Sequence, residues 1–307
     1  MSGLFPKNIS AATRFCAVYG HPVQHSASPA MQNAGLAALG LDWRYVAFDV
    51  HPENLRAAIA GAKAMKFVGL NLTVPHKLLA LDLVDVLDES ARRWGAVNTI
   101  RFEARDADGA WKPLREFADV PDDIRTHGFN TDADGIARAI REDLQIELRG
   151  ARVLLLGAGG AGRAAALKLA HEGVDELHLV NRTSAKAEEV ARDIREQCPD
   201  VRVSVGYPET PVELLLNATS LGLKPDDSLP LDVKAFPLRM VDAIYDMIYR
   251  PSETPLLKAG QIEGCRVANG LGMLLHQGAK ALEIWSGQPA PLEAMRAALK
   301  ENVYGAK

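Results

Sequence analysis

Six small residues, Gly157-Ala158-Gly159-Gly160-Ala161-Gly162, form a pattern with a clear chemical meaning in this chain of 307 residues. Gly157, Gly159 and Gly162 have the GxGxxG spacing of a loop that approaches the pyrophosphate of a dinucleotide. The first glycine permits a tight turn, the second allows close backbone approach, and the third lets a helix pack on a strand. An apolar strand-like run precedes the pattern and a helix-like run follows it. We therefore expect a dinucleotide to bind at this helix N-terminus.

The end of the next strand-like run indicates which dinucleotide this is. An NAD site usually places an acidic residue about 20 residues after the loop, where it binds the ribose 2′-hydroxyl. Asn181-Arg182-Thr183 stand there instead, and Lys186 follows. A guanidinium presents paired N–H donors that match a phosphate. The sequence therefore predicts NADP rather than NAD as the cofactor.

Four polar clusters stand near the ends of strand-like runs in the first half of the chain, at residues 25–29, 71–77, 95–99 and 130–132. Each has a structural explanation on its own. Ser28 is expected to cap a helix, Lys77 to lie on a solvated helix, and its neighbour His76 to lie on the surface. Open α/β sheets, however, form their binding sites at strand ends. Taken together, the clusters predict a substrate site.

The elements that must position these residues alternate between strand and helix. In the first half, strands are expected at 15–20, 45–50, 67–74 and 97–102, and helices at 28–40, 52–66 and 75–94. Such alternation implies parallel strands with right-handed crossovers. Residues 104–126 interrupt it as a surface excursion, and a helix over 131–144 connects to a second block. There, strands are expected at 153–156, 176–180, 201–205, 213–216 and 240–244, and helices at 160–171, 184–197, 272–285 and 291–303.

The composition is that of a globular protein with about two domains. Hydrophobic residues make up 48% of the chain and charged residues 24%. The formal charge of −4 argues against a nucleic-acid binder, which usually has a basic excess. Three widely spaced cysteines suggest neither a disulfide framework nor a metal site, and no apolar run reaches the length of a membrane span. We expect a cytoplasmic protein without a metal.

Nine motifs, in order, resemble those of the shikimate dehydrogenase family: HSASP, NLTVPHK, GAVNT, NTD, GAGGAGRA, NRTSAKA, NATSLG, YDMIY and NGLGMLLHQ. The resemblance implies an α/β protein. Its N-terminal mixed αβ domain would bind shikimate or 3-dehydroshikimate, and a Rossmann-type domain with a doubly wound parallel sheet would bind NADP. The substrate domain is expected at residues 1–131 and 272–307, because the C-terminal helices return to it. The cofactor domain is expected at residues 132–271.

The resemblance also implies roles for individual residues. Lys77 and Asp132 would form the catalytic pair. The substrate would be bound by Ser26 and Ser28 at its carboxylate and by Asn71, Thr73, Asn98, Tyr249 and Gln277 elsewhere. The cofactor would be bound by Gly157, Ala158, Gly159, Gly160, Ala161, Gly162, Asn181, Arg182, Thr183, Lys186, Thr219, Met247 and Gly270.

The chemistry of such a reaction fits a lysine. Converting a secondary alcohol to a ketone moves a hydride to the nicotinamide, and a side chain must take the proton. Lys77 can do so, and as an ammonium it polarises the carbonyl in the reverse reaction. Asp132 would orient Lys77 and the substrate hydroxyl or share the proton.

Two other functions stay open. One is a dehydrogenase that uses both quinate and shikimate, although Ser26, Ser28 and Arg182 favour shikimate. The other is a dinucleotide-binding sensor without catalysis, against which the presence of both Lys77 and Asp132 counts. The sequence leaves open whether the chain is a monomer or a homodimer.

Overall fold

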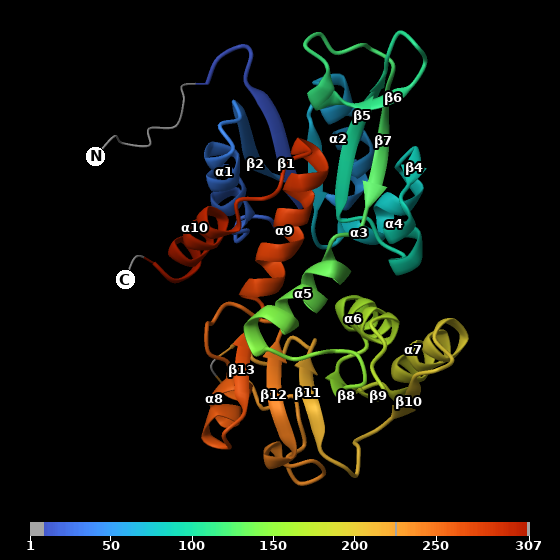
Figure 1. Cartoon of the computed structure of the whole chain (residues 1–307), viewed down its shortest axis with the longest axis vertical. Helices are drawn as coiled ribbons and strands as arrows, with labels where there is room; N and C mark the ends of the chain where they lie inside the picture. Colours follow the sequence, from blue (N-terminus) through green and yellow to red (C-terminus); the bar gives the residue numbers. More distant parts are fainter. Residues whose placement is uncertain (1–8, 225, 306–307) are drawn as a thin grey trace. The chain divides into compact units, whose positions relative to one another are not determined.

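The computed structural model describes residues 9–224 and 226–305 (Figure 1). These residues form two compact units. Unit 1 holds the described part of residues 1–132 and of residues 277–307, and unit 2 holds that of residues 133–276. The chain therefore leaves unit 1 at the start of helix α5 (Asp132–Leu144) and returns to it within helix α9 (Leu271–Ser286).

Unit 1 contains a mixed sheet. Its strands are β1 (Arg14–Gly20), β2 (Trp43–Asp49), β3 (Gly69–Leu72), β4 (Val86–Leu87), β5 (Thr99–Arg105), β6 (Trp111–Pro113) and β7 (Ile124–Phe129). The order is β2-β1-β3-β5-β7-β4, with β6 paired to β5. Strand β1 is parallel to β2 and β3, whereas β5 is antiparallel to β3, β6 and β7. The predicted mixed αβ domain is confirmed, but the expectation that its strands all pair in parallel is wrong.

Unit 1 also contains helices and short 3-10 turns. They are α1 (Ser28–Ala38), η1 (Pro52–Asn54), α2 (Leu55–Ala64), α3 (His76–Leu79), η2 (Ala80–Asp82), α4 (Glu89–Trp94), η3 (Leu114–Glu116) and α10 (Leu292–Tyr304), together with the C-terminal part of α9. No helix of residues 9–224 or 226–305 combines the length and the apolar character that a membrane span needs.

Residues 75–94, which the sequence analysis assigns to one helix, contain α3, η2, β4 and α4 instead. Two aspartates account for the interruption. Asp85 Oδ2 accepts a hydrogen bond of 2.7 Å from the backbone N of Thr126, which holds this segment to β7. Asp88 Oδ1 accepts a bond of 2.9 Å from the backbone N of Ser90 and so caps α4. Strand β4 then pairs with the far strand β7, and the chain afterwards enters β5 antiparallel to β3.

The core of unit 1 lies against β5. Ile100, Phe102 and Ala104 alternate along the strand and are fully buried in one apolar cluster. From the returning helix α9, the indole N–H of Trp285 donates a 2.9 Å hydrogen bond to the carbonyl of Ile100. Because this bond joins residues 185 positions apart, it ties the C-terminal stretch to the N-terminal sheet.

Glu103 lies between these core positions on the strand and points to the other face of the sheet. Its carboxylate is almost fully buried, and Arg101, Arg125 and His127 all bond to it. Burial by itself would raise the pKa of Glu103, but the hydrogen bonds from His127, Arg101 and Arg125 outweigh it and lower the pKa to about 2. The ionised carboxylate therefore stabilises the fold.

Glu103→Gln is expected to flatten the acid side of the stability profile. A carboxyl with a lowered folded pKa stabilises the fold fully above its ordinary value of 4.5 and loses that contribution as the pH falls towards about 2. Free energies of unfolding should therefore fall less steeply across this range in the variant than in the wild type. Glu53→Gln, at a side chain that is 86% exposed, is the control. Equal slopes in all three proteins would contradict the prediction.

Unit 2 contains a parallel sheet with the strands β8 (Arg152–Leu156), β9 (Glu176–Val180), β10 (Arg202–Val205), β11 (Val212–Asn217), β12 (Val241–Asp246) and β13 (Arg266–Asn269). The order is β10-β9-β8-β11-β12-β13, so the connection reverses direction between β8 and β11. Loops at the carboxyl ends of strands form binding sites at such a reversal. The predicted Rossmann-type doubly wound sheet is confirmed.

Helices α6 (Gly160–His171) and α7 (Ser184–Gln197) pack on one another, α6 beside β8 and α7 beside β9 and β10 (Figure 1). Unit 2 also contains most of α5, the start of α9, the turn η4 (Leu238–Met240) and helix α8 (Pro255–Ile262). No element is predicted at α8 or at β13. Helix α8 follows a loop that contains Pro251, and β13 is a strand of only four residues after a short turn at Glu263–Cys265.

Candidate active site

Lys77 and Asp132 form an ion pair in unit 1. Lys77 lies on the single turn of α3, and Asp132 is the first residue of α5. Lys77 Nζ donates a hydrogen bond of 2.7 Å to Asp132 Oδ2. Both side chains are partly accessible, with exposed fractions of 31% and 15%. A cation that solvent and small molecules can reach, held at a fixed distance from a carboxylate, can exchange a proton with a bound alcohol.

Backbone and amide contacts fix both ends of this pair. The carbonyl of Lys77 accepts a bond of 2.9 Å from the backbone N of Val97. Asn130 Oδ1 accepts a bond of 3.1 Å from the backbone N of Asp132, and Asn130 Nδ2 donates to the carbonyl of Ala96 at 3.1 Å. Because Val97 and Ala96 are neighbours, the same short loop holds the lysine and the aspartate.

A buried network of amides and hydroxyls lies at the ends of β3, β5 and β7. Asn71 Nδ2 donates to Thr99 Oγ1 at 3.0 Å, and Asn98 Nδ2 donates to Thr131 Oγ1 at 2.9 Å. Asn98 Nδ2 also lies 3.5 Å from Gln277 Oε1. The structure therefore brings the predicted residues Asn71, Asn98 and Gln277 together. Their polar groups can both donate and accept, as a polyhydroxylated ligand requires.

Three members of this network are absent from the residues predicted to bind substrate. The Tyr45 hydroxyl donates a bond of 2.7 Å to Asn71 Oδ1 from the neighbouring part of the sheet. Thr99 and Thr131 are fully buried partners of the asparagines. Both threonines stand inside the GAVNT and NTD motifs, so the motifs themselves could have identified them. Tyr45 has no such signal in the sequence.

Three other residues predicted to bind substrate, Ser26, Ser28 and Thr73, also belong to unit 1 but have few side-chain hydrogen bonds. Ser26 Oγ accepts a long bond of 3.4 Å from the backbone N of Ser28. The prediction that Ser28 caps a helix is wrong, because α1 begins at Ser28 and Ala27 occupies the cap position. The Ser28 hydroxyl instead bonds to the buried Tyr45 hydroxyl. Thr73 is partly buried, and its methyl group packs on Gly20.

His76 does not lie on the surface, so that expectation is wrong. Its side chain is fully buried next to Lys77, whereas Leu78 and Leu79 are exposed. Burial lowers the pKa of His76, and the Val50 backbone opposes this shift. Because α3 is only one turn long, the residue beside Lys77 points into the unit.

The glycine loop lies in unit 2 between β8 and α6. Gly157 has a φ of +102°, a backbone conformation that residues with a side chain rarely adopt. Its N–H donates a hydrogen bond of 2.8 Å to the carbonyl of Val180. A Cβ at Gly162 would lie 2.0 Å from the Gly157 carbonyl oxygen, so only glycine allows this close approach. A Cβ at Gly159 or Gly160 would have no atom of the described residues within 4 Å. The exposed backbone at these two positions can therefore accept a phosphate group.

The end of β9 adjoins this loop. Asn181 Oδ1 accepts a bond of 3.0 Å from the backbone N of Ala158, and Asn181 Nδ2 donates to the carbonyl of Thr183 at 2.9 Å. Arg182 and Lys186 are exposed, and no ion-pair partner of either is found within the described part of the chain. The absence of a carboxylate after β9 and the two uncompensated cations fit a 2′-phosphate.

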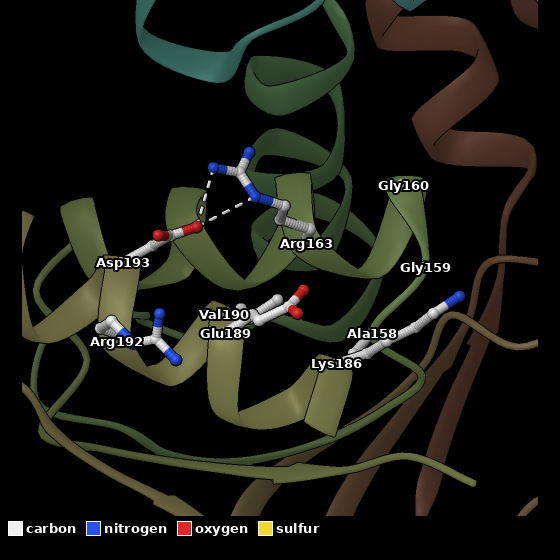
Figure 2. Close-up of a pocket in the computed structure, with 9 residues that line it drawn as sticks. All are labelled: Ala158, Gly159, Gly160, Arg163, Lys186, Glu189, Val190, Arg192 and Asp193. Carbon is white, nitrogen blue, oxygen red and sulfur yellow. Dashed lines mark hydrogen bonds and ion pairs between the residues drawn. The ribbon is translucent and has the colours of Figure 1, made fainter. Parts of the chain in front are cut away.

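A pocket of about 440 Å³ opens beside the loop (Figure 2). It is lined by Ala158, Gly159, Gly160, Arg163, Lys186, Glu189, Val190, Arg192 and Asp193. Arg163 and Asp193 form an ion pair of 2.9 Å across it, shown by dashed lines in Figure 2. The residues of α7 beyond Lys186 are not among the predicted site residues, although they recur at helical spacing along a predicted helix.

The remaining predicted residues stand on loops of unit 2 that follow β11, β12 and β13. The Thr219 hydroxyl donates to Asn217 Oδ1 at 2.8 Å, and the Gly270 N–H donates to the carbonyl of Ile248 at 3.1 Å. A Cβ at Gly270 would lie 2.0 Å from the Met247 carbonyl oxygen, so these two loops touch. Tyr249 is partly buried, and burial raises its pKa.

Gly162→Ala and Gly159→Ala are expected to separate packing from cofactor binding. Gly162→Ala forces the loop and α6 apart and should lower the free energy of unfolding by about 1–3 kcal/mol. Gly159→Ala should change stability by less than about 0.5 kcal/mol, but its methyl group would block a pyrophosphate and raise the KM for NADP. Chemical unfolding and steady-state kinetics measure the two effects. Equal loss of stability in both variants would contradict this division of roles.

Comparison with known proteins finds relatives along most of the chain. Family models match residues 18–100 (shikimate dehydrogenase substrate binding domain), 138–204 (shikimate / quinate 5-dehydrogenase) and 270–300 (shikimate 5′-dehydrogenase C-terminal domain). A shikimate dehydrogenase (NADP(+)) from Methanopyrus kandleri is 39% identical over 303 residues, which cover 96% of this chain and 98% of the relative.

Solved structures agree with these matches. A crystal structure of a shikimate dehydrogenase in complex with NADP+ aligns with a TM-score of 0.81 and 34% identity, covering 96% of this chain and 98% of the other. Shikimate 5-dehydrogenase from Thermus thermophilus in complex with NADP(H) and shikimate aligns with a TM-score of 0.77 and 35% identity, covering 94% and 99%.

Proposed function

The chain belongs to the shikimate dehydrogenase family, and we propose that it interconverts shikimate and 3-dehydroshikimate with NADP as its cofactor. The observation that carries this proposal is the 2.7 Å ion pair of Lys77 with Asp132, held by the same loop that leads into the buried amide and hydroxyl network. The pair can move a proton, and the network can bind a ring with several hydroxyl groups.

We assign substrate binding to residues 1–131 and 272–307 and cofactor binding to residues 132–271. Ser26 and Ser28 bind the substrate carboxylate through their hydroxyls. Asn71, Asn98 and Gln277 bind the ring hydroxyls, together with Thr73 and Tyr249. A site of this kind rejects analogues that lack a hydroxyl, because its buried polar groups would lose their partners.

Lys77 acts on the reacting oxygen. As an ammonium it donates a proton to the carbonyl oxygen during reduction, and it takes the proton from the hydroxyl during oxidation. Asp132 orients the ammonium through the 2.7 Å hydrogen bond and accepts from the same substrate hydroxyl. The pair thereby handles the proton that accompanies every hydride transfer.

The residues of unit 2 fit NADP. The pyrophosphate would lie on the backbone of Gly157–Gly162, where Gly159 and Gly160 leave open space. Asn181, Arg182, Thr183 and Lys186 would hold the 2′-phosphate, and Thr219, Met247 and Gly270 the nicotinamide end. When bound, the nicotinamide supplies or takes the hydride.

The test is an assay of the purified protein with NADP and shikimate, followed by the absorbance of NADPH. Turnover of shikimate with NADP supports the proposal, and quinate or NAD should be used far less well. Comparable turnover of quinate would instead indicate a dual-specificity enzyme, because quinate carries one more hydroxyl near the carboxylate. Binding of NADP without turnover of either substrate would indicate a sensor and overturn the proposal.

A further inference from the structure

A fully buried carboxylate lies at the end of β12, beneath the loops to which we assign the nicotinamide end of NADP. Asp246 Oδ1 accepts hydrogen bonds from Asn217 Nδ2 at 3.0 Å and from the backbone N of Ile248 at 3.1 Å. Asp246 Oδ2 accepts a bond of 2.7 Å from the Thr254 hydroxyl. Asp246, Asn217 and Thr254 each have no exposed surface. This carboxylate therefore joins three segments of unit 2 from within.

The first of these segments leads to Thr219. Asn217 uses its amide nitrogen for Asp246, while its Oδ1 accepts from the backbone N of Thr219 at 3.0 Å and from the Thr219 hydroxyl at 2.8 Å. A displacement of the Asn217 side chain would thus carry the Thr219 loop with it.

The second segment, at Met247 and Ile248, reaches Gly270, and the third, at Thr254, reaches helix α8. Asp246 is the residue before Met247, whose backbone N donates to the carbonyl of Asn217 at 3.0 Å. The carbonyl of Ile248 accepts the N–H of Gly270 at 3.1 Å. Thr254 caps α8 through a bond from the backbone N of Leu257 and so ties the loop after β12 to that helix.

We propose that Asp246 is a positioning residue that holds the loops of Thr219, Met247 and Gly270 in register for the nicotinamide ring. This inference rests on the proposed function. The hydrogen bonds of Asp246 within the described residues go to Asn217, Ile248 and Thr254, and none of them reaches the glycine loop. Its loss should therefore affect the hydride-transferring end of the cofactor and spare the phosphate end.

The chemistry of the network predicts a rescue by the amide. Burial raises the pKa of Asp246, so a neutral group is tolerated at this position. In Asp246→Asn the side-chain oxygen can still accept from Asn217 and Ile248, and the new NH2 group can donate to the Thr254 hydroxyl, which also accepts. Asp246→Ala removes all three bonds and leaves their donors unpaired.

The experiment compares kcat, the KM for shikimate, and the inhibition constant of adenosine 2′,5′-bisphosphate, an NADP fragment without nicotinamide. Asp246→Ala should lower kcat at least about tenfold, because small misplacements of a reacting group are costly. The inhibition constant of the fragment should stay within about twofold of the wild type, and Asp246→Asn should retain most of kcat. Wild-type kcat in folded Asp246→Ala, or equal weakening of the fragment, would overturn the proposal.

Two further variants keep the test decisive if Asp246→Ala does not fold. Thr254→Val removes one bond of the network and should lower kcat, whereas Thr254→Ser keeps the hydroxyl and should not. Glu213→Gln is the matched control, because Glu213 stands at the opposite end of β11 and bonds to the backbone N of Arg152 at 2.7 Å. Wild-type kcat in Thr254→Val would overturn the proposal. Absence of shikimate turnover in the unmodified enzyme would instead refute the proposed function.

Discussion

Lys77→Ala is expected to lower kcat for shikimate oxidation by about a thousandfold, within the range of general acid–base catalysis. The KM for shikimate should change by less than about threefold, because we assign substrate binding to the serines and to the buried amide network. The physical reason is that Asp132 remains in place but can no longer hold an ammonium at the reacting oxygen. Steady-state rates with NADP and shikimate measure both constants.

The chain offers a matched control for this variant. Lys112 and Asp106 form an ion pair of 2.8 Å at the β5–β6 hairpin, with a lysine that is 47% exposed. Lys112→Ala removes the same kind of side chain from the same kind of pair and should leave kcat and KM unchanged. A Lys77→Ala enzyme with normal kcat and a raised KM would make Lys77 a binding residue.

The glycine loop shows what local sequence can predict. Its position between the end of β8 and the first turn of α6 is confirmed. The close packing that would place a Cβ at Gly162 2.0 Å from the Gly157 carbonyl oxygen involves residues only five positions apart. The strand that precedes the loop is a continuous apolar run, and the helix that follows has regular spacing. These signals need no knowledge of the tertiary structure.

Contacts between distant residues could not be predicted in this way. Tyr45 reaches Asn71 across 26 residues, and Arg163 reaches Asp193 across 30. Whether these side chains meet depends on strand order and helix packing, which single residues do not encode. The prediction that His76 lies on the surface is wrong for a related reason. A helix of one turn has no periodicity from which a buried face could be read.

Residues 75–94 show that apolar periodicity alone can predict a continuous helix where the chain forms several shorter elements. Apolar residues recur there at intervals that suit a helix, but Asp85 and Asp88 find backbone partners that a continuous helix would deny them. Aspartate favours caps and turns for this reason. The short strand β4 lies between these two aspartates and pairs with β7, a long-range contact that local periodicity does not reveal.

Arg182→Ala is expected to lower kcat/KM for NADP by about a hundredfold, equivalent to the loss of a charge-assisted hydrogen bond of up to about 3 kcal/mol. The same variant should use NAD as well as the wild type does, within about twofold, because NAD has no 2′-phosphate for the guanidinium to bind. Initial rates with each cofactor at saturating shikimate measure this change in selectivity.

Arg202 provides the control at the other end of the same part of the sheet. It begins β10 and pairs with Asp175 and Glu176 at 2.8 and 2.6 Å, at the amino end of β9, whereas Arg182 follows the carboxyl end of β9. Arg202→Ala should leave the ratio of NADP to NAD use unchanged. If Arg182→Ala impairs both cofactors equally, the guanidinium supports the loop rather than the 2′-phosphate. Selectivity would then have to come from other cations that line the pocket beside the loop, such as Lys186 and Arg192.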